Sequence, residues 1–394
     1  MTEKLYWKFP YKTEFIAKIT EIDRKKGIVF DKTLFYPQGG GQESDKGYFE
    51  IQQKTIPVKN VTIDGQKIFH QIDSKNIQNL TVNQEIKGKI DWEYRYGLMK
   101  AHTAQHLVSA LFENTYSIET ERAYIESNRV ILKLSETISY KQLKHVLKDT
   151  NVISIMRDLK VIEEILTREE VLKKYKSLRG KIPDQKPIRI VKIEDLDIIC
   201  CGGTHVKELN EIGPIFIDEF KGKNEIKFKI GNDSIYDIIR SNIELLEIAN
   251  ELNMKITDFK KKFSSISNNL GNLEKENEDL KLWIINETLK NPNYILNHIK
   301  VFLLDLSVNY DTLIKKLDEI PENSLFIVFN SNNRIRIISK VEKVSANQIV
   351  SRIKEFFNGK GGGNEFNAQI YIEENFEKVK SEIKNLIKDL ISTI

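Results

Sequence analysis

The sequence is organised around the stretch Tyr96-Gly-Leu-Met-Lys-Ala-His-Thr-Ala-Gln-His-Leu-Val-Ser-Ala-Leu-Phe112. Its apolar residues recur at the spacing of an amphipathic helix, and no glycine or proline follows Gly97. His102 and His106 are four residues apart, which places their Cβ atoms about 5 to 6 Å from each other on one helix face. The stretch therefore predicts a helix that directs two imidazoles toward one point.

A second group of metal-ligand residues follows about a hundred residues later, in Cys201-Gly-Gly-Thr-His205. The segment Asp197–Cys200 has the composition of a buried strand, and two glycines then permit a tight turn that returns His205 toward Cys201. The chain has only six histidines and two cysteines, so this grouping is hard to attribute to chance. We expect one tetrahedral zinc site with the ligands His102, His106, Cys201 and His205.

The alternatives to a zinc site are weaker. A lone histidine on an amphipathic helix is more often a packed or surface residue than a ligand, but two pairs together favour a metal. The mixed imidazole and thiolate set favours zinc over copper or iron. Position 103 is threonine, so the first pair is not the HExxH motif of a metalloprotease. Cys200 is expected to be a small buried hydrophobic residue.

The bulk composition indicates a cytoplasmic protein of several domains. A length of 394 residues suggests two to four domains. No apolar run approaches the length of a membrane span, and the N-terminus lacks a signal-peptide pattern, so no membrane partner is expected. The two cysteines are adjacent in sequence and cannot stabilise so large a fold through a disulfide bond.

The net charge of +4 does not by itself indicate a polyanionic partner, so any contact with nucleic acid must be local. The segment 173–192 is the candidate, since its many basic residues, Lys181 among them, are accompanied by the single acid Asp184. The alternative is a solvated, lysine-rich loop.

Residues 1–90 alternate short apolar runs with turn signals, which is typical of a small β-barrel. Between two of these runs lies Thr33-Leu-Phe-Tyr-Pro-Gln-Gly-Gly-Gly-Gln42. Three consecutive glycines allow the backbone to approach a ligand closely, although an ordinary hairpin turn is the alternative. The polar groups of Thr33, Gln38 and Gln42 favour a ligand site.

The remaining chain divides into three parts, so that the expected fold is α+β and multidomain. Residues 91–235 mix helices and strands around the zinc ligands. Residues 236–291 carry a heptad pattern, with Asn277 at an a position, whose partner is a helix of the same chain or of another subunit. Residues 292–394 resemble a separate α/β domain. The heptad positions are Leu252, Ile256, Phe259, Phe263, Ile266, Leu270, Leu273, Asn277, Leu280 and Ile284.

The last domain contains a second glycine-rich segment, Asn358–Gln369, which we expect to be a loop after a helix. It is not a P-loop, because no serine or threonine follows Lys360 and no strand directly precedes it. Exposed backbone N–H groups and one lysine would suit an RNA phosphate.

Four segments, in this order, resemble the long form of the AlaX proteins, which are free-standing homologues of the editing half of alanyl-tRNA synthetase. The matching segments are Phe35–Gln42, Asp91–His106 with Arg95, Cys201–Val206 with Ile212-Gly213, and Gly359–Gly363 with Ala368-Gln369. The last segment resembles a domain shared with DHH phosphoesterases. No Asp-His-His occurs in this chain, so phosphoesterase activity is not implied.

The resemblance implies a Zn²⁺-dependent hydrolase that removes wrongly attached serine, and often glycine, from tRNA specific for alanine, without ATP. No aminoacylation module is expected before the barrel. Thr33 and Gln42 match positions near the substrate, and a hydroxyl-reading Thr33 would favour serine over alanine. The amides of Gly40 and Gly41 would stabilise the developing oxyanion. The expected tRNA contacts are Arg95, Lys181, Lys360, Gly361 and Gly362, and the expected homodimer forms through the helical segment and the C-terminal domain.

Two questions stay open at the level of sequence. Four protein ligands fill a tetrahedral zinc, so either one ligand yields, the zinc becomes five-coordinate, or it positions the substrate. The rival function is a tRNA-binding or regulatory protein whose zinc is purely structural.

Overall fold

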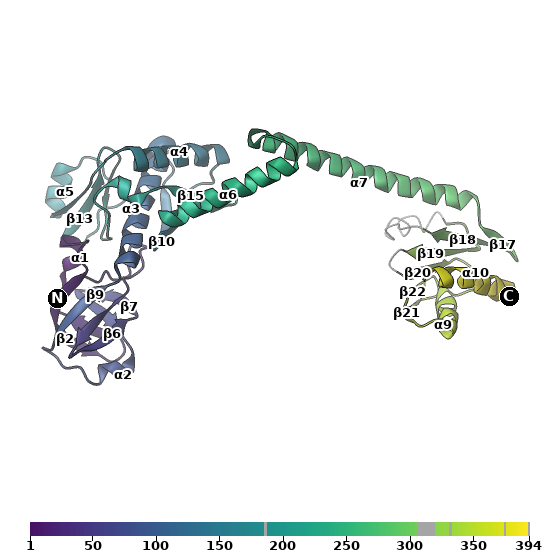
Figure 1. Cartoon of the computed structure of the whole chain (residues 1–394), viewed down its shortest axis with the longest axis horizontal. Coiled ribbons are helices and arrows are strands. Elements are labelled where there is room, and N and C mark those ends of the chain that lie inside the picture. The colour runs from purple at the N-terminus through teal and green to yellow at the C-terminus, as the bar shows by residue number, and fades with distance from the viewer. Residues whose placement is uncertain (185–186, 306–319, 331–332, 374–375, 393–394) are drawn as a thin grey trace. The chain divides into compact units, whose positions relative to one another are not determined.

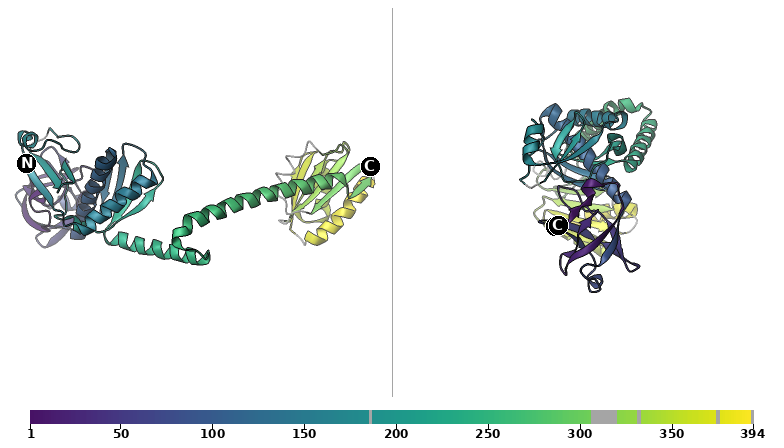
Figure 2. Two further views of the ribbon diagram at one scale, coloured as in Figure 1. Left: turned by 90° about the horizontal axis from the view of Figure 1, so that it is seen from above. Right: turned by 90° about the vertical axis from the view of Figure 1, so that its left-hand side faces the viewer.

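The computed structural model describes residues 1–184, 187–305, 320–330, 333–373 and 376–392 (Figures 1 and 2). The chain divides into two compact units, Met1–Ile248 and Ala249–Ile394. Their boundary falls inside the segment 236–291, which the sequence predicted as one helical part, and residues 1–90 and 91–235 share the first unit. A search of the described helices finds none that is long and apolar enough to cross a membrane.

Residues 1–90 form a seven-stranded antiparallel sheet in the order β6-β5-β9-β2-β3-β8-β7. Alternate residues of β2 and β9 are buried, and they contribute to one core with Phe15, Phe30 and Phe49. The short apolar runs that the sequence shows in this region form strands of the sheet. The strands are β2 (Glu14–Asp23), β3 (Gly27–Phe30), β5 (Gly47–Ile51), β6 (Lys54–Val58), β7 (Asn60–Asp64), β8 (Lys67–Gln71) and β9 (Glu85–Ile90).

The predicted β-barrel is not confirmed. β6 and β7 stand at the two ends of the strand order, and within residues 1–90 no ladder joins them. Only Lys59 separates these two strands, and one residue is too short a connection for an antiparallel hairpin. Three short elements complete the region: β1 (Glu3–Lys4), which pairs in parallel with β4 (Lys32–Thr33), and the helices α1 (Leu5–Lys8) and α2 (Ser74–Ile77).

The first unit is built around the helix α3 (Trp92–Tyr116), as the central stretch of sequence predicted. Asp91 caps its N-terminus by accepting the Tyr94 N–H at 3.2 Å, and Ser117 ends it in the left-handed conformation with φ 57°. From Ala101 to Phe112 every residue is buried. A helix buried all round must be covered on several sides.

The cover of α3 comes from a four-stranded sheet, in the order β10-β11-β16-β15, and from α4 and η1. The elements are β10 (Thr120–Glu126), β11 (Arg129–Leu134), β15 (Ile215–Phe220), β16 (Glu225–Ile230), α4 (Tyr140–Met156) and the 3₁₀ turn η1 (Leu209–Ile212). A three-stranded sheet lies beside them, with β12 (Val161–Leu166), β13 (Ile188–Ile193) and β14 (Asp197–Cys200), and with the short helix α5 (Arg168–Lys174) after β12. The strand predicted before Cys201 is therefore confirmed as β14.

The heptad pattern is shorter than predicted. The helix α6 (Asn232–Glu251) ends before Leu252, because Asn253 adopts a left-handed φ of 48° and Met254 N–H bonds back to Ala249. Ile256 lies in the 3₁₀ turn η2 (Ile256–Asp258), and only then does the long helix α7 (Phe259–Lys290) begin.

The second unit contains α7 and a six-stranded mixed sheet in the order β17-β18-β19-β20-β22-β21. Within this sheet β18 and β19 pair in parallel. The helix α9 packs with α10 on the apolar core of the sheet. The elements are β17 (Tyr294–Leu296), β18 (Ile299–Asp305), β19 (Ser324–Asn330), β20 (Arg334–Ser339), α9 (Ala346–Phe356), β21 (Gly359–Gly363), β22 (Asn367–Ile372) and α10 (Phe376–Ser392).

The second glycine-rich segment is a strand, and the prediction of a loop was wrong. Gly359–Gly363 forms β21 and pairs antiparallel with β22. A Cβ on Gly361 would lie 2.0 Å from the Gln369 carbonyl oxygen, so the glycines allow the two strands to approach closely. β21 is the last strand in the sheet order and has one edge without a neighbouring strand among the described residues.

Candidate metal centre

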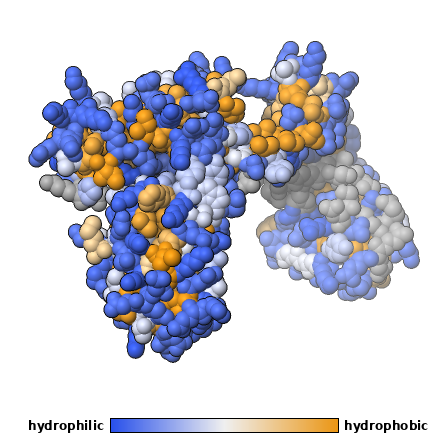
Figure 3. All heavy atoms as spheres, turned by 60° about the vertical axis from the view of Figure 1, so that its left-hand side comes forward, coloured by the Kyte–Doolittle hydropathy of each residue, from blue (hydrophilic) through white to orange (hydrophobic). Residues whose placement is uncertain are grey.

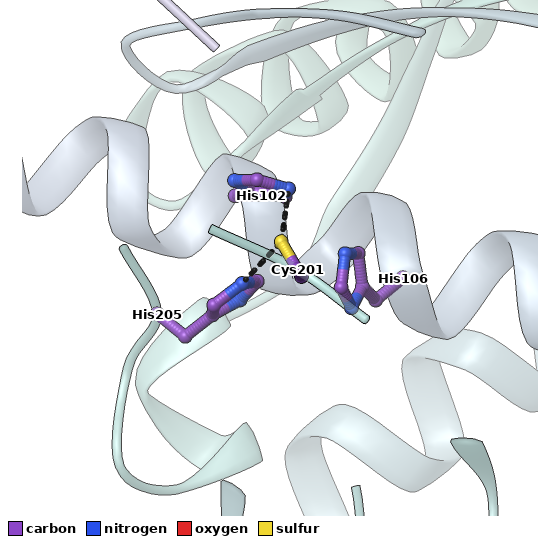
Figure 4. Close-up of side chains that lie close together, drawn as sticks. All are labelled: His102, His106, Cys201 and His205. Carbon is purple, nitrogen blue, oxygen red and sulfur yellow. Dashed lines mark hydrogen bonds between the residues drawn. The ribbon is translucent and has the colours of Figure 1, made fainter. Parts of the chain in front are cut away.

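Four side chains from two distant segments converge in the first unit (Figure 4). His102 and His106 come from consecutive turns of α3, Cys201 directly follows β14, and His205 lies in the loop before η1. Each offers a ligand atom, and these atoms all lie within 4.8 Å of one another. The structure thus brings together the four residues that the sequence singled out.

The spacing of the donors suits a zinc ion. The Cys201 Sγ lies 3.4 Å from His102 Nε2 and 3.3 Å from His205 Nε2. Zinc bonds of about 2.3 Å to sulfur and 2.05 Å to nitrogen place tetrahedral ligands roughly 3.3 to 3.6 Å apart. Three imidazoles and one thiolate also match the ligand preference of zinc.

His102 is oriented by Gln42, a buried residue of the first glycine-rich segment. The Gln42 Oε1 accepts the His102 Nδ1–H at 2.7 Å, which leaves Nε2 to face the cluster. The same oxygen accepts the Thr204 N–H at 3.1 Å, and Gln42 Nε2 donates to Thr204 Oγ1 at 3.0 Å. One amide therefore links α3 to the loop that carries the other two ligands, in the way that second-layer partners fix metal-bound histidines.

A polar group also lies near the Nδ1 atom of each of the other two histidines. Thr103 donates its hydroxyl to Met99 O, and its oxygen lies 3.2 Å from His205 Nδ1, which can donate to it. Asp197 places Oδ2 3.7 Å from His106 Nδ1. Arg179 holds that carboxylate with two hydrogen bonds of 2.8 Å.

The Arg189 side chain binds the backbone of the loop that carries Cys201 and His205. Its Nη1 donates to Cys201 O at 2.9 Å and to Gly203 O at 2.7 Å, and its Nη2 lies 2.6 Å from Glu163. Gly203 is required for space, because a Cβ there would lie 2.1 Å from His102 Cε1 and 2.8 Å from Gln42 Oε1. The turn was predicted to need glycine for its conformation, but neither glycine of the turn has a positive φ.

Burial controls the protonation of the ligands. Burial first, and then the nearby charges of Arg189 and Arg179, lower the pKa of His102 to about 3. His106 and His205 have pKa values well below the ordinary range for the same first reason. The imidazoles are therefore neutral near pH 7, with a lone pair for a cation.

Two effects act in opposite directions on the pKa of the Cys201 thiol. Burial raises its pKa, while Arg189 lowers it. Thiolate is the form that binds zinc, and a bound cation together with the nearby arginine would favour it.

Three protein-family models match parts of the chain. Residues 2–94 match the model of class II (A) tRNA synthetases, residues 188–227 match the second additional domain of threonyl and alanyl tRNA synthetases, and residues 308–393 match the DHHA1 domain. The alanyl-tRNA editing protein AlaX-L of Pyrococcus horikoshii is 29% identical over 402 residues, which cover 96% of each chain. The chain is a relative of the alanyl-tRNA editing proteins.

Alanine–tRNA ligases are similar along the same residues. Those of Methanobrevibacter smithii and Methanococcus maripaludis are 27% and 26% identical and cover 92% and 98% of this chain. The chain spans only 43% and 44% of the length of these ligases, in contrast to its nearly complete overlap with the editing protein.

The first glycine-rich segment, Thr33–Gln42, ends in a tight turn. Gly39 and Gln42 exchange two backbone hydrogen bonds of 3.1 and 3.0 Å, and Gly40 and Gly41 between them have φ values of 59° and 84°. Gly41 also packs closely, since a Cβ there would lie 2.3 Å from the Ala123 carbonyl oxygen. The segment therefore ends in a turn that places Gln42 beside His102, and its role as a ligand site stays a prediction.

Thr33 is not brought to the metal cluster by any contact that the described residues show. It is fully buried, its hydroxyl lies 2.9 Å from His70 Nε2, and it accepts the Phe35 N–H at 3.1 Å. His70 Nδ1 in turn faces the Ile28 carbonyl oxygen at 3.0 Å. The reading of a substrate hydroxyl by Thr33 stays a prediction.

Arg95 requires a correction, because it cannot contact RNA from its place in the fold. Its side chain is 0% exposed and forms a two-pronged ion pair with Asp45, which is equally buried. It also donates to Pro10 O and Leu34 O. Arg95 joins α3 to the N-terminal sheet.

The other predicted RNA contacts are at the surface. Lys181 is exposed, although residues 185–186 of the basic segment lie outside the described part of the chain. Lys360 is 86% exposed and lies 3.2 Å from Glu373. Gly361 and Gly362 belong to the exposed strand β21. Their contact with tRNA stays a prediction.

Several residues of the site were not identified from the sequence as functional. Thr103 and Thr204 stand inside the two ligand motifs, beside a histidine in each case, and this adjacency was the available signal. Arg179 and Arg189 are more than ten residues from the ligands along the chain, and the folded sheet brings them near, whereas Asp197 is four residues before Cys201 and faces His106 only in the folded chain.

Proposed function

We propose that this protein is a zinc-dependent hydrolase that deacylates tRNA specific for alanine when the tRNA carries serine or glycine. The observation that carries the proposal is the His102, His106, Cys201 and His205 cluster with its orienting partners, found in a chain that overlaps an alanyl-tRNA editing protein almost completely. Zinc at this donor set supplies a positive charge that can polarise an ester carbonyl or lower the pKa of a water to about 7.

The residues around the cluster would perform the remaining tasks. Gln42 and Thr103 hold the imidazoles of His102 and His205 by hydrogen bonds, so these two ligands would be oriented before substrate arrives, and the Asp197 carboxylate faces His106. The turn at Gly39–Gln42 uses the N–H groups of its two end residues for its own hydrogen bonds. The N–H groups of Gly40 and Gly41 have no partner among the described residues, and they are the donors we propose for the developing oxyanion.

The test follows the release of labelled serine from seryl-tRNA specific for alanine, with alanyl-tRNA as the control substrate. We expect release of serine but not of alanine by the wild type, and loss of release in His102→Ala and Cys201→Ala.

The rival function is a tRNA-binding protein with a structural zinc. It predicts zinc in stoichiometric amount and retained tRNA affinity, with no release of serine or glycine by the wild type. That result would contradict the hydrolase proposal.

A further inference from the structure

The metal cluster has one side that reaches the surface. His102, His106 and His205 are 1 to 3% exposed, whereas Cys201 is partly exposed and the next residue, Gly202, is exposed. The Cys201-Gly202 turn is therefore the part of the ligand loop next to the cluster that meets solvent. The groups that line this turn are candidates for holding the part of the substrate next to the scissile bond.

Trp7 lies directly against this turn. Its indole N–H donates to the Gly202 carbonyl oxygen at 2.8 Å, although the two residues are far apart in sequence. The indole Cζ2 is also the nearest atom, at 4.0 Å, to the position that a Gly202 Cβ would occupy. A Cβ at position 202 would therefore be in ordinary van der Waals contact with the indole.

The position of the indole is fixed by its neighbours and not by the turn alone. Trp7 belongs to α1, which follows strand β1. The adjacent Tyr6 is 2% exposed and packs edge-on against both Trp7 and Tyr36, with ring centroids 6.1 and 5.4 Å apart. Trp7 is only partly exposed, so its ring is held while part of its surface remains available.

A lysine stands over this ring. Lys4 Nζ lies 4.2 Å from the Trp7 ring centroid. Lys8 of the same segment is paired with Glu3, but within the described residues Lys4 has no carboxylate partner. Lys4 is only partly exposed, and this burial lowers the pKa of its ammonium. An aromatic ring with an unneutralised cation is the combination by which proteins bind single-stranded nucleotides.

We propose that Trp7 and Lys4 form the subsite for the 3′-terminal nucleotide of the RNA, with the indole stacking on the base and the lysine contacting the phosphate. The subsite rests on the proposed function, since the amino acid is esterified to that nucleotide and must reach the cluster beside Gly202. Trp7 acts here on binding and positioning, and it takes no part in the chemical step.

The first experiment measures stacking without hydrolysis. The chain has three tryptophans, at positions 7, 92 and 283, so Trp92→Phe with Trp283→Phe leaves Trp7 as the only one. We expect the trinucleotide CCA to quench the fluorescence of this protein in a saturable way. The matched control, Trp7→Phe with Trp283→Phe, retains Trp92 and should not respond. An absent response at Trp7, or an equal response in the control, would overturn the proposal.

The second experiment separates binding from support of the ligand loop. Trp7→Leu should raise KM for seryl-tRNA about tenfold, as loss of one stacked base predicts, with kcat and zinc content little changed. Trp7→Phe keeps an aromatic face and should recover most of the affinity. Loss of zinc in Trp7→Leu would show that the indole only supports Cys201, and it would overturn the subsite.

The third experiment tests the lysine. Lys4→Met should reduce the slope of log affinity for CCA-ended RNA against log salt by about 0.7, the value for one phosphate of a single strand. Lys8→Met is the matched control and should leave the slope unchanged. If the wild type releases no serine, the proposed function fails, while the fluorescence and salt titrations still decide whether the subsite exists.

Discussion

The two longest helices of the molecule, α3 and α7, have opposite relations to their surroundings. α3 is covered by a sheet, by α4 and by η1, so even its polar residues His102, Thr103 and Gln105 are buried. In α7 only Ile285 is buried among the described residues, and Phe263, Leu270 and Leu273 are 64%, 57% and 62% exposed. Apolar patches of this kind interrupt a mostly hydrophilic surface (Figure 3).

The difference shows what each helix depends on. α3 is completed by its own chain, and its interior position gives the metal ligands a dry, fixed environment. α7 exposes an apolar seam that its own unit does not cover within the described residues, and an exposed seam of this spacing is typical of a helix that pairs with another. The homodimer predicted from the heptads therefore stays our proposal for α7.

The largest expected effect comes from removing a ligand on α3. His106→Ala should lower the rate of serine release by about a thousandfold, equivalent to about 4 kcal/mol, because the charge that assists ester cleavage is lost with the metal. Zinc content and release are measured on the same sample. His145→Ala, an exposed histidine of α4, is the control. Full activity in His106→Ala would show that α3 does not carry the chemistry.

Next in size is the loss of the buried ion pair that ties α3 to the N-terminal sheet. Arg95→Met leaves the Asp45 carboxylate buried without its partner and should cost about 3 to 5 kcal/mol of stability. Urea denaturation measures the cost, and Arg95→Met with Asp45→Leu should recover part of it. Normal stability combined with weakened tRNA binding would restore the surface role that the sequence predicted for Arg95.

A smaller effect is expected from Gln42, which touches α3 without binding the metal. Gln42→Leu removes the acceptor of the His102 Nδ1–H and should weaken zinc affinity about 10- to 100-fold. Competition with a chelator measures the affinity, and Gln38→Leu, an exposed change in the same segment, is the control. Unchanged zinc affinity with a higher KM would assign Gln42 to the substrate instead.

The smallest effect on the folded chain is expected in α7. Leu273→Asp should change the free energy of unfolding by no more than about 0.5 kcal/mol, because the side chain is already exposed. It should nevertheless shift a dimer toward monomer in sedimentation velocity, while Lys275→Asp on the same helix does not. A wild-type chain that is monomeric at high concentration would contradict the homodimer.

The metal ligands could be predicted from the sequence because their pairing is local. Residues four apart on a helix or across a glycine turn face one point whatever surrounds them, so His102 with His106, and Cys201 with His205, were recognisable before folding. The same local logic predicted α3, β14 and the strands of the N-terminal sheet. The same logic predicted a longer heptad pattern than the structure has, because one left-handed residue, Asn253, ends α6 and divides the pattern.

Only the tertiary structure decided which polar residues remain available for binding and which have partners inside the protein. Arg95 lies in a matched segment and Thr33 was expected near the substrate, yet folding buries both and gives each a partner inside the protein. Asp197 and Trp7, which the sequence did not mark as functional, are brought beside the ligands by the strand β14 and the short helix α1. Local spacing determines which side chains share a face, but burial and long-range hydrogen bonds determine what those side chains can still bind.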